Sequence, residues 1–273
     1  MCYGDKEGDF MEFVAFYLGD INIYWYGLII VFALLIGLGI SKIMFKLYGE
    51  KFSPMWDLLV WMIPAGLIGA RIFFVIMHID VYASNLIQIF CIWQGGLSIY
   101  GALFGFLMTS IVFLHKYDYN LWLWFDLMMP ALLFGLTVLQ LANFMMQFSL
   151  GTPLGLDIPN DHSLAEYVEY RYRPTGFEAY QYFQPVALYQ AFAYSIVFII
   201  SILVLLFNRK YKFLAEGTTF LFSIMLMAII RFCIGFMYFS VNKDMLLYPM
   251  QWIALTVMIM TVLVYIAKRF QHN

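Results

Sequence analysis

Two arginines, Arg71 and Arg231, lie inside long apolar stretches of this chain. A guanidinium in the hydrocarbon core of a bilayer costs at least about 2.5 kcal/mol on insertion scales, so it normally has a partner or a task. Its planar fork of donors matches the oxygens of a phosphate, and the pairing strengthens where the dielectric constant is low. Both residues are therefore candidates for binding the phosphate group of a lipid.

Four neutral polar residues accompany the arginines in other apolar stretches: Tyr26, Tyr100, Gln140 and Asn143. At about 1.5 Å per helical residue, the arginines and the two amides fall roughly 8 to 12 Å below the outer surface, and the tyrosines within about two turns of it. Each residue alone has a structural explanation, such as an interfacial tyrosine or an asparagine bonded to a neighbouring helix. Their shared depth favours one lipid headgroup site in the outer leaflet.

Seven apolar stretches carry these residues. The chain has 273 residues, of which 64% are hydrophobic and only 12% charged, whereas soluble domains have roughly 45–50% apolar and about 25% charged residues. A helix of about 20 apolar residues spans a bilayer. The sequence therefore predicts an all-α integral membrane protein, with residues 1–273 forming a single membrane domain of seven transmembrane helices. The predicted spans are residues 24–40, 55–78, 96–114, 121–148, 185–207, 218–239 and 248–267.

The distribution of lysine and arginine predicts the orientation, because these residues collect in cytoplasmic loops. With the N-terminus outside, the inner segments hold nine Lys and Arg residues and the outer segments hold four. The C-terminus is then cytoplasmic. The long polar segment between the fourth and fifth spans, residues 149–184, forms a small extracytoplasmic head.

Several other classes of function are disfavoured. A net charge of −2 gives no electrostatic basis for binding nucleic acid. The three cysteines, Cys2, Cys91 and Cys233, lack metal-ligand spacing, so we expect neither a metal nor a cofactor. Asp57 and Asp126 lie near the inner helix ends, and we interpret them as capping or surface groups.

Short motifs follow one another along residues 21–270. Tyr26 lies in the stretch YWYGL, Arg71 ends the triplet GAR, and Tyr100 lies in GGLSIYG. Asn143 precedes a phenylalanine and lies eight residues before Gly151, and Arg231 is in the sixth span. In order and spacing, these motifs resemble those of bacterial prolipoprotein diacylglyceryl transferases, where histidine is usual at the position of Tyr100.

The resemblance implies a reaction in the bacterial inner membrane. The family transfers the diacylglyceryl group of phosphatidylglycerol to the sulfur of a lipobox cysteine in a prolipoprotein, which gives a thioether and glycerol phosphate. It implies Tyr26, Tyr100 and Arg231 as catalytic candidates. The lipid-binding candidates are Arg71, Gln140, Asn143, Gly151 and Arg231.

The chain also departs from the family pattern where that pattern is charged. Gln140 stands in place of an arginine, Phe148 and Gly235 in place of acidic residues, and Gln190 in place of a glutamate. Two hypotheses follow: a diverged active transferase, or a non-catalytic pseudoenzyme that binds lipid or lipoprotein as a subunit of an envelope complex. A transporter is less favoured, because the sequence shows no inverted repeat.

Overall fold

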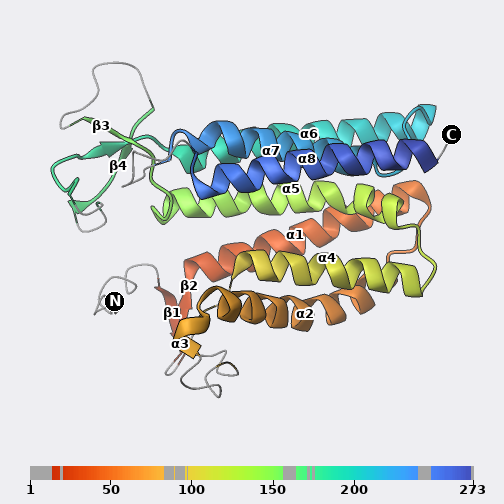
Figure 1. Ribbon diagram of the computed structural model, residues 1–273, viewed down its shortest axis with the longest axis horizontal. Coiled ribbons are helices and arrows are strands. Elements are labelled where there is room, and N and C mark those ends of the chain that lie inside the picture. Colours follow the sequence, from red (N-terminus) through yellow and green to blue (C-terminus); the bar gives the residue numbers. More distant parts are fainter. Residues whose placement is uncertain are drawn as a thin grey trace. The chain divides into compact units, whose positions relative to one another are not determined.

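The computed structural model describes residues 14–18, 21–82, 89, 96, 98–155, 164–170, 173, 176–238 and 247–271. Helices dominate this described part (Figure 1). The long ones are α1 (Trp25–Tyr48), α2 (Pro54–Met77), α4 (Ile99–Lys116), α5 (Leu121–Met145), α6 (Val186–Tyr211), α7 (Thr218–Gly235) and α8 (Pro249–Gln271). A four-residue helix, α3 (Ile79–Tyr82), follows α2.

Among the described residues, six of these helices are long and apolar enough to cross a membrane: α1, α2, α5, α6, α7 and α8. The apolar part of α4, Gly101–Lys116, is shorter than each of these six helices. A bilayer core needs about 20 helical residues, fewer where the bilayer thins. The structure confirms an all-α integral membrane protein, and the seventh span stays a prediction.

The helix bounds differ from the predicted spans mainly at the C-terminal ends of the helices. Helix α1 continues to Tyr48, since Lys42 and Lys46 end an apolar run without ending a helix. Helix α7 ends at Gly235, where the N–H of Met237 turns back to the carbonyl of Ile234 at 2.9 Å. Arg231 therefore lies in the last turn of α7, about 6 Å from its end, whereas the predicted span continued to residue 239.

The chain divides into two compact units, one of residues 42–125 and one of residues 1–41 with 126–273. In the first, α2 and α4 lie side by side along small residues (Figure 1). A Cβ at Gly69 would lie 2.5 Å from the carbonyl oxygen of Gly101, and one at Gly105 would lie 2.5 Å from that of Ala65. Such glycines allow two helix backbones to approach closely in a membrane.

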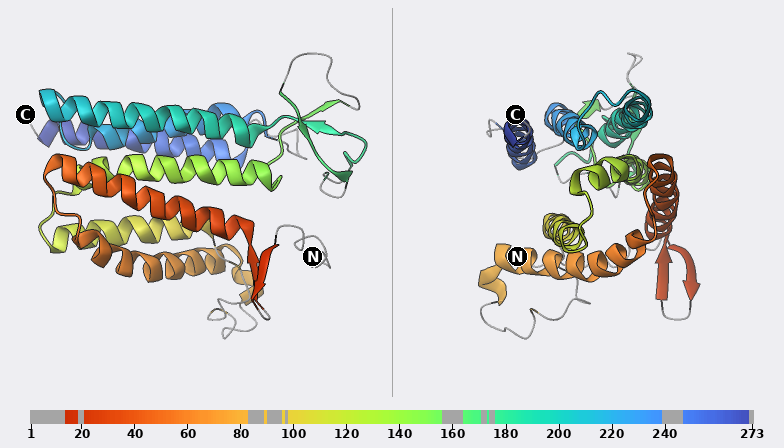
Figure 2. Two further views of the ribbon diagram at one scale, coloured as in Figure 1. Left: turned by 180° about the vertical axis from the view of Figure 1, so that it is seen from behind. Right: turned by 90° about the vertical axis from the view of Figure 1, so that its right-hand side faces the viewer.

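In the second unit, α7 packs against both α6 and α8 (Figures 1 and 2). Met129 and Leu133 of α5 and Val197 of α6 form a buried core. At the start of α7, the buried Asp126 of α5 accepts the N–H of Gly217 at 2.6 Å and that of Phe220 at 2.7 Å. These bonds confirm Asp126 as a capping residue, for α7 rather than for its own helix.

Two small sheets, which the sequence analysis did not predict, lie outside the helices. Strands β1 (Val14–Leu18) and β2 (Ile21–Tyr24) form an antiparallel pair that leads into α1. Between α5 and α6, strands β3 (Pro153–Gly155), β4 (Glu166–Tyr167) and β5 (Tyr182–Phe183) form an antiparallel sheet in the order β3-β5-β4. This sheet occupies the segment predicted as a head, which we call the head sheet.

Candidate lipid-binding site

Arg231 is held at the end of α7 by a network around Gln190 of α6. The guanidinium Nη1 donates to Oε1 of Gln190 at 3.1 Å, and the hydroxyl of Tyr238 donates to the same oxygen at 2.9 Å. The amide Nε2 of Gln190 donates to the hydroxyl of Tyr194 at 2.7 Å. Gln190 has no exposed surface, so this network fixes the position of Arg231.

The charge of Arg231 is surrounded by neutral groups. Its other contacts include Nη2 to the sulfur of Met250 at 3.7 Å, the guanidinium over the ring of Tyr238 at 5.8 Å, and a hydrogen bond to the hydroxyl of Tyr194. In the part of the chain that the structure describes, Arg231 forms no ion pair with a carboxylate, and its side chain is only half-buried. Its charge is therefore available to an anionic ligand.

A second network joins α1 to α5. The hydroxyl of Tyr26 donates to Oδ1 of Asn143 at 3.3 Å, and Nδ2 of Asn143 donates to Oε1 of Gln140 at 3.2 Å. Phe148 packs edge-on against Tyr26, with 5.4 Å between ring centroids. Three predicted site residues therefore meet, and an aromatic ring lies beside Tyr26 where the family pattern has an acidic group.

Gly151 lies where the chain leaving α5 crosses two other segments. Its N–H donates to the carbonyl of Gln184 at 3.1 Å, and it forms a bridge with Tyr238. A Cβ at this position would lie 2.5 Å from the carbonyl oxygen of Gln184. Only glycine fits, and the crossing places Tyr238 next to the Gln190 network.

Arg71 lies in the other unit, and its side chain donates hydrogen bonds to backbone carbonyls. The buried guanidinium donates from Nε to the carbonyl of Ile89 at 2.8 Å and from Nη1 to that of Gly96 at 3.0 Å. It also lies over the ring of Tyr82 at 5.2 Å. A site shared by Arg71 and Arg231 therefore stays a prediction. Tyr100 is in the first turn of α4, and its side chain lies outside the described residues.

Sequence reasoning noted Gln190 only as a departure from the family pattern and missed Tyr194 and Tyr238. The sequence did contain a signal that links Gln190 to Tyr194, because the two residues are four apart in an apolar helix and so share one face. Tyr238 had no such signal, because it follows α7 and reaches Gln190 through the bridge to Gly151.

The head sheet contains a buried acid, Glu166, with 6% of its surface exposed. Neither carboxylate oxygen has a hydrogen-bond partner among the described residues. Burial raises the pKa of Glu166 from its usual value to about 7. Within the described part of the chain, no group of three or more His, Cys, Asp and Glu side chains is arranged to hold a metal ion.

The comparisons with known proteins agree with these features. A family model described as prolipoprotein diacylglyceryl transferase matches residues 13–267. The phosphatidylglycerol–prolipoprotein diacylglyceryl transferase of Lactobacillus acidophilus is 30% identical over 94% of this chain and 89% of that protein. The enzyme of the same name from Listeria monocytogenes serotype 4b is 32% identical over 76% of this chain and 72% of that protein. The chain therefore belongs to the prolipoprotein diacylglyceryl transferase family.

Proposed function

We propose that this protein of the bacterial inner membrane binds phosphatidylglycerol from the outer leaflet, with Arg231 as the main contact to the lipid phosphate. The observation that carries the proposal is the guanidinium of Arg231, which is fixed by Gln190 at 3.1 Å and surrounded by neutral groups. A fixed, uncompensated cation near the end of an apolar helix suits a phosphodiester below the headgroup surface. In this proposal Gln140, Asn143 and Gly151 complete the lipid site.

We further propose that the chain binds this lipid without transferring it. Transfer needs a stabilised leaving phosphate and an acceptor for the thiol proton. The two networks contain one guanidinium, amides and phenols, and among the described residues neither network includes a carboxylate or an imidazole. Binding without turnover suits a pseudoenzyme that presents a lipid or holds a lipoprotein in an envelope complex.

The second candidate is an active diacylglyceryl transferase that acts on prolipoproteins. Two observations favour it: the hydrogen bond between Tyr26 and Asn143, and 30% identity to a named transferase over 94% of the chain. In that case Tyr26, Tyr100 and Arg231 would be the catalytic residues. A tyrosine hydroxyl can move a proton, and Arg231 would stabilise the departing phosphate.

Both candidates share one topology. Seven helices cross the membrane, the N-terminus and the head segment are outside, and the C-terminus is cytoplasmic. The excess of Lys and Arg in the proposed inner segments supports this arrangement. A reporter fused after Asn273 that is active only outside the cell would contradict it.

The deciding experiment measures binding and transfer on the same purified protein in phosphatidylcholine vesicles. We expect phosphatidylglycerol to bind in preference to phosphatidylcholine, and Arg231→Gln to remove that preference. Arg209→Gln, which removes an exposed arginine from the last turn of α6, is the control and should have no effect. Labelled diacylglyceryl transfer to a lipobox peptide is then assayed, with the Listeria relative as positive control.

The two measurements separate the proposals. Preference for phosphatidylglycerol without transfer supports a lipid-binding pseudoenzyme. Transfer at a rate near that of the Listeria relative overturns the non-catalytic proposal and favours the second candidate. An unchanged lipid preference in Arg231→Gln overturns the binding site itself.

A further inference from the structure

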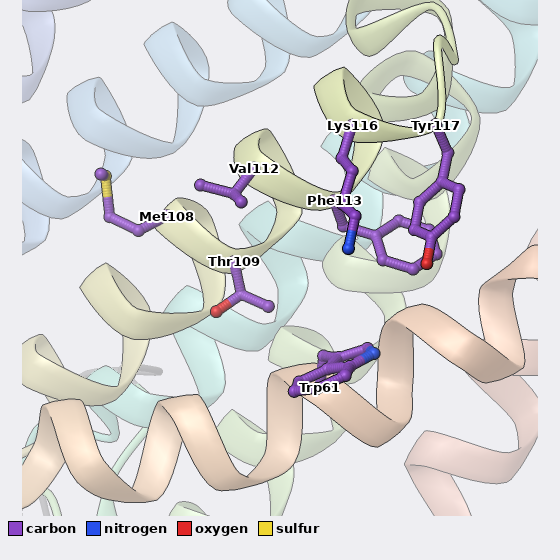
Figure 3. Close-up of a pocket in the computed structure, with 7 residues that line it drawn as sticks. All are labelled: Trp61, Met108, Thr109, Val112, Phe113, Lys116 and Tyr117. Atoms are coloured by element: carbon purple, nitrogen blue, oxygen red, sulfur yellow. The ribbon is translucent and has the colours of Figure 1, made fainter.

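A groove lies between the first half of α2 and the second half of α4, and its lining includes no residue of the two networks. Its volume is about 370 Å³, within the range of ligand pockets. Figure 3 shows Lys116 and Tyr117 at one end, Met108 at the other, and Trp61 of α2 facing the residues of α4. The lining residues are Trp61, Met108, Thr109, Val112, Phe113, Lys116 and Tyr117.

The groove runs from a polar end to an apolar end along the helix axis. Lys116 is the last residue of α4, and the apolar helix Gly101–Lys116 precedes it. The ammonium group is therefore at the level where the helix leaves the hydrocarbon, and Met108 lies about 12 Å deeper. A phospholipid has the same order of parts, a charged headgroup followed by an acyl chain.

The walls of the groove are open to lipid. Trp61 is 62% exposed, Val112 60% and Tyr117 51%. One side of any molecule bound in the groove is therefore in contact with lipid acyl chains, which disfavours a small polar solute. Thr109, in the middle of the groove, is the one hydroxyl along the apolar side, and its neighbours Met108 and Val112 are apolar.

The polar end carries an available positive charge. In the described part of the chain, the ammonium of Lys116 contacts the ring of Tyr117 at 5.5 Å and forms no ion pair with a carboxylate. The side chain bends toward Trp61 over the groove (Figure 3). A phosphate in this position gains a charge-assisted bond to Lys116, while its acyl chain covers the exposed indole and valine.

We propose that this groove is a second lipid site that selects an anionic phospholipid, with its headgroup on Lys116 and its acyl chain along Trp61 and Val112. With the proposed topology, this lipid belongs to the cytoplasmic leaflet. The site does not depend on Arg231 or on transferase activity. The selectivity for an anionic lipid comes from the positive charge of Lys116. In a zwitterionic lipid, the cation of the headgroup competes with Lys116 for the phosphate.

Quenching of Trp61 fluorescence by brominated acyl chains tests the proposal. The full chain is placed in phosphatidylcholine vesicles with a small fraction of either brominated phosphatidylserine or brominated phosphatidylcholine. The contribution of Trp61 is the quenching in the unmodified chain minus that in Trp61→Phe. We expect roughly fivefold tighter association of the anionic lipid, from about 1 kcal/mol per lysine near an anionic headgroup.

Three variants make the result specific. Lys116→Gln should equalise the two lipids, and Lys116→Arg should keep the preference. Lys210→Gln is the matched control, since Lys210 also lies over a neighbouring tyrosine, Tyr211, at 5.2 Å but is not part of the groove. It should keep the full preference.

Two outcomes overturn the proposal. Equal quenching of Trp61 by both lipids in the unmodified chain shows that the groove does not select anionic lipid. An equal loss in Lys116→Gln and Lys210→Gln shows a general surface charge and no site. Arg231→Gln should leave the Trp61 signal unchanged, which separates this test from that of the proposed function.

Discussion

The guanidinium of Arg231 donates to the amide oxygen of Gln190 at 3.1 Å, so a neutral side chain holds the cation of the candidate site. Tyr238 donates to the same oxygen at 2.9 Å. The amide oxygen accepts a hydrogen bond from the guanidinium but, unlike a carboxylate, leaves its positive charge uncancelled. The arrangement therefore combines a fixed position with an attraction for anions.

Gln190→Glu tests this relationship. The carboxylate would form an ion pair with Arg231 and compete with a lipid phosphate for the same donors. The preference for phosphatidylglycerol over phosphatidylcholine should fall roughly tenfold, or about 1.4 kcal/mol. Lipid competition on the purified protein, followed by native mass spectrometry, measures this preference.

Gln181→Glu is the control, because Gln181 is exposed beside the head sheet and the new charge does not contact Arg231. We expect it to keep the preference of the unmodified chain. An unchanged preference in Gln190→Glu would mean that Arg231 does not contact the lipid phosphate.

Asp126→Asn is expected to destabilise the protein by about 1–3 kcal/mol. The carboxylate of Asp126 accepts two N–H groups at the start of α7, at 2.6 and 2.7 Å. The amide can accept only one of these bonds and presents its own N–H₂ group to the other donor. Thermal unfolding of the purified protein in detergent measures the loss.

Asp57→Asn provides the matched comparison. Asp57 also lies in the first turn of a helix, α2, but it is exposed. Its interaction with the helix dipole is worth at most about 1 kcal/mol in such an exposed position. Equal losses for the two variants would contradict a special capping role for Asp126.

The order of the apolar helices could be read from the sequence because each one contains a long stretch with few charged residues. The fifth to seventh predicted spans begin within one residue of helices α6, α7 and α8. Apolarity does not mark where a helix ends, so Lys42 and Lys46 belong to α1 and the apolar residues after Gly235 do not belong to α7.

The site could be predicted only in part, for a related reason. Tyr26, Gln140 and Asn143 were identified as polar residues at one depth, and the structure joins them in one network. Depth does not reveal which side chains face each other, so the partners of Arg231 were missed. The bridge between Gly151 and Tyr238 joins residues far apart in sequence and leaves no local pattern.

Glu166 should make the stability of the head sheet depend on pH. Burial raises its pKa to about 7, and in the unfolded chain the pKa returns to the ordinary value near 4.5. Between these two values the folded chain binds more protons than the unfolded chain, so stability falls as pH rises. The loss from pH 4.5 to pH 7 is at most about 3 kcal/mol.

Hydrogen exchange at the amide of Val168, which bonds to the carbonyl of Gln181 at 3.0 Å beside β4, reports this stability. After correction for intrinsic exchange rates, protection should decline from pH 5 to pH 8, and Glu166→Gln should remove the decline. In Glu178→Gln the decline should persist, because the bonds of the Glu178 carboxylate to the N–H of Gly176 lower the pKa of Glu178. A decline that persists in Glu166→Gln would exclude Glu166 as its cause.

Restoring the family's charged residues should fail unless Gln251 is changed as well. A Cβ at Gly235 would lie 2.7 Å from Cγ of Gln251, which is fully buried. Gln251 cannot move aside freely, since its Oε1 accepts the N–H of Tyr248 at 2.8 Å and its Nε2 donates to the carbonyl of Phe232 at 3.4 Å. Gln251 therefore occupies the space that the side chain of a glutamate at position 235 would need.

We predict that Gln140→Arg with Gly235→Glu gives a less stable protein that does not transfer diacylglyceryl to a lipobox peptide. Adding Gln251→Ala should recover stability and give the combination its best chance of activity, because the carboxylate then has room beside Arg231. A double-mutant cycle isolates the packing: Gly235→Ala should cost about 1–3 kcal/mol alone and at least about 1 kcal/mol less beside Gln251→Ala. The double variant Gln140→Arg with Gly235→Glu could instead prove fully stable and active in transfer with Gln251 unchanged. That result would show that the close contact at Gly235 does not limit this site.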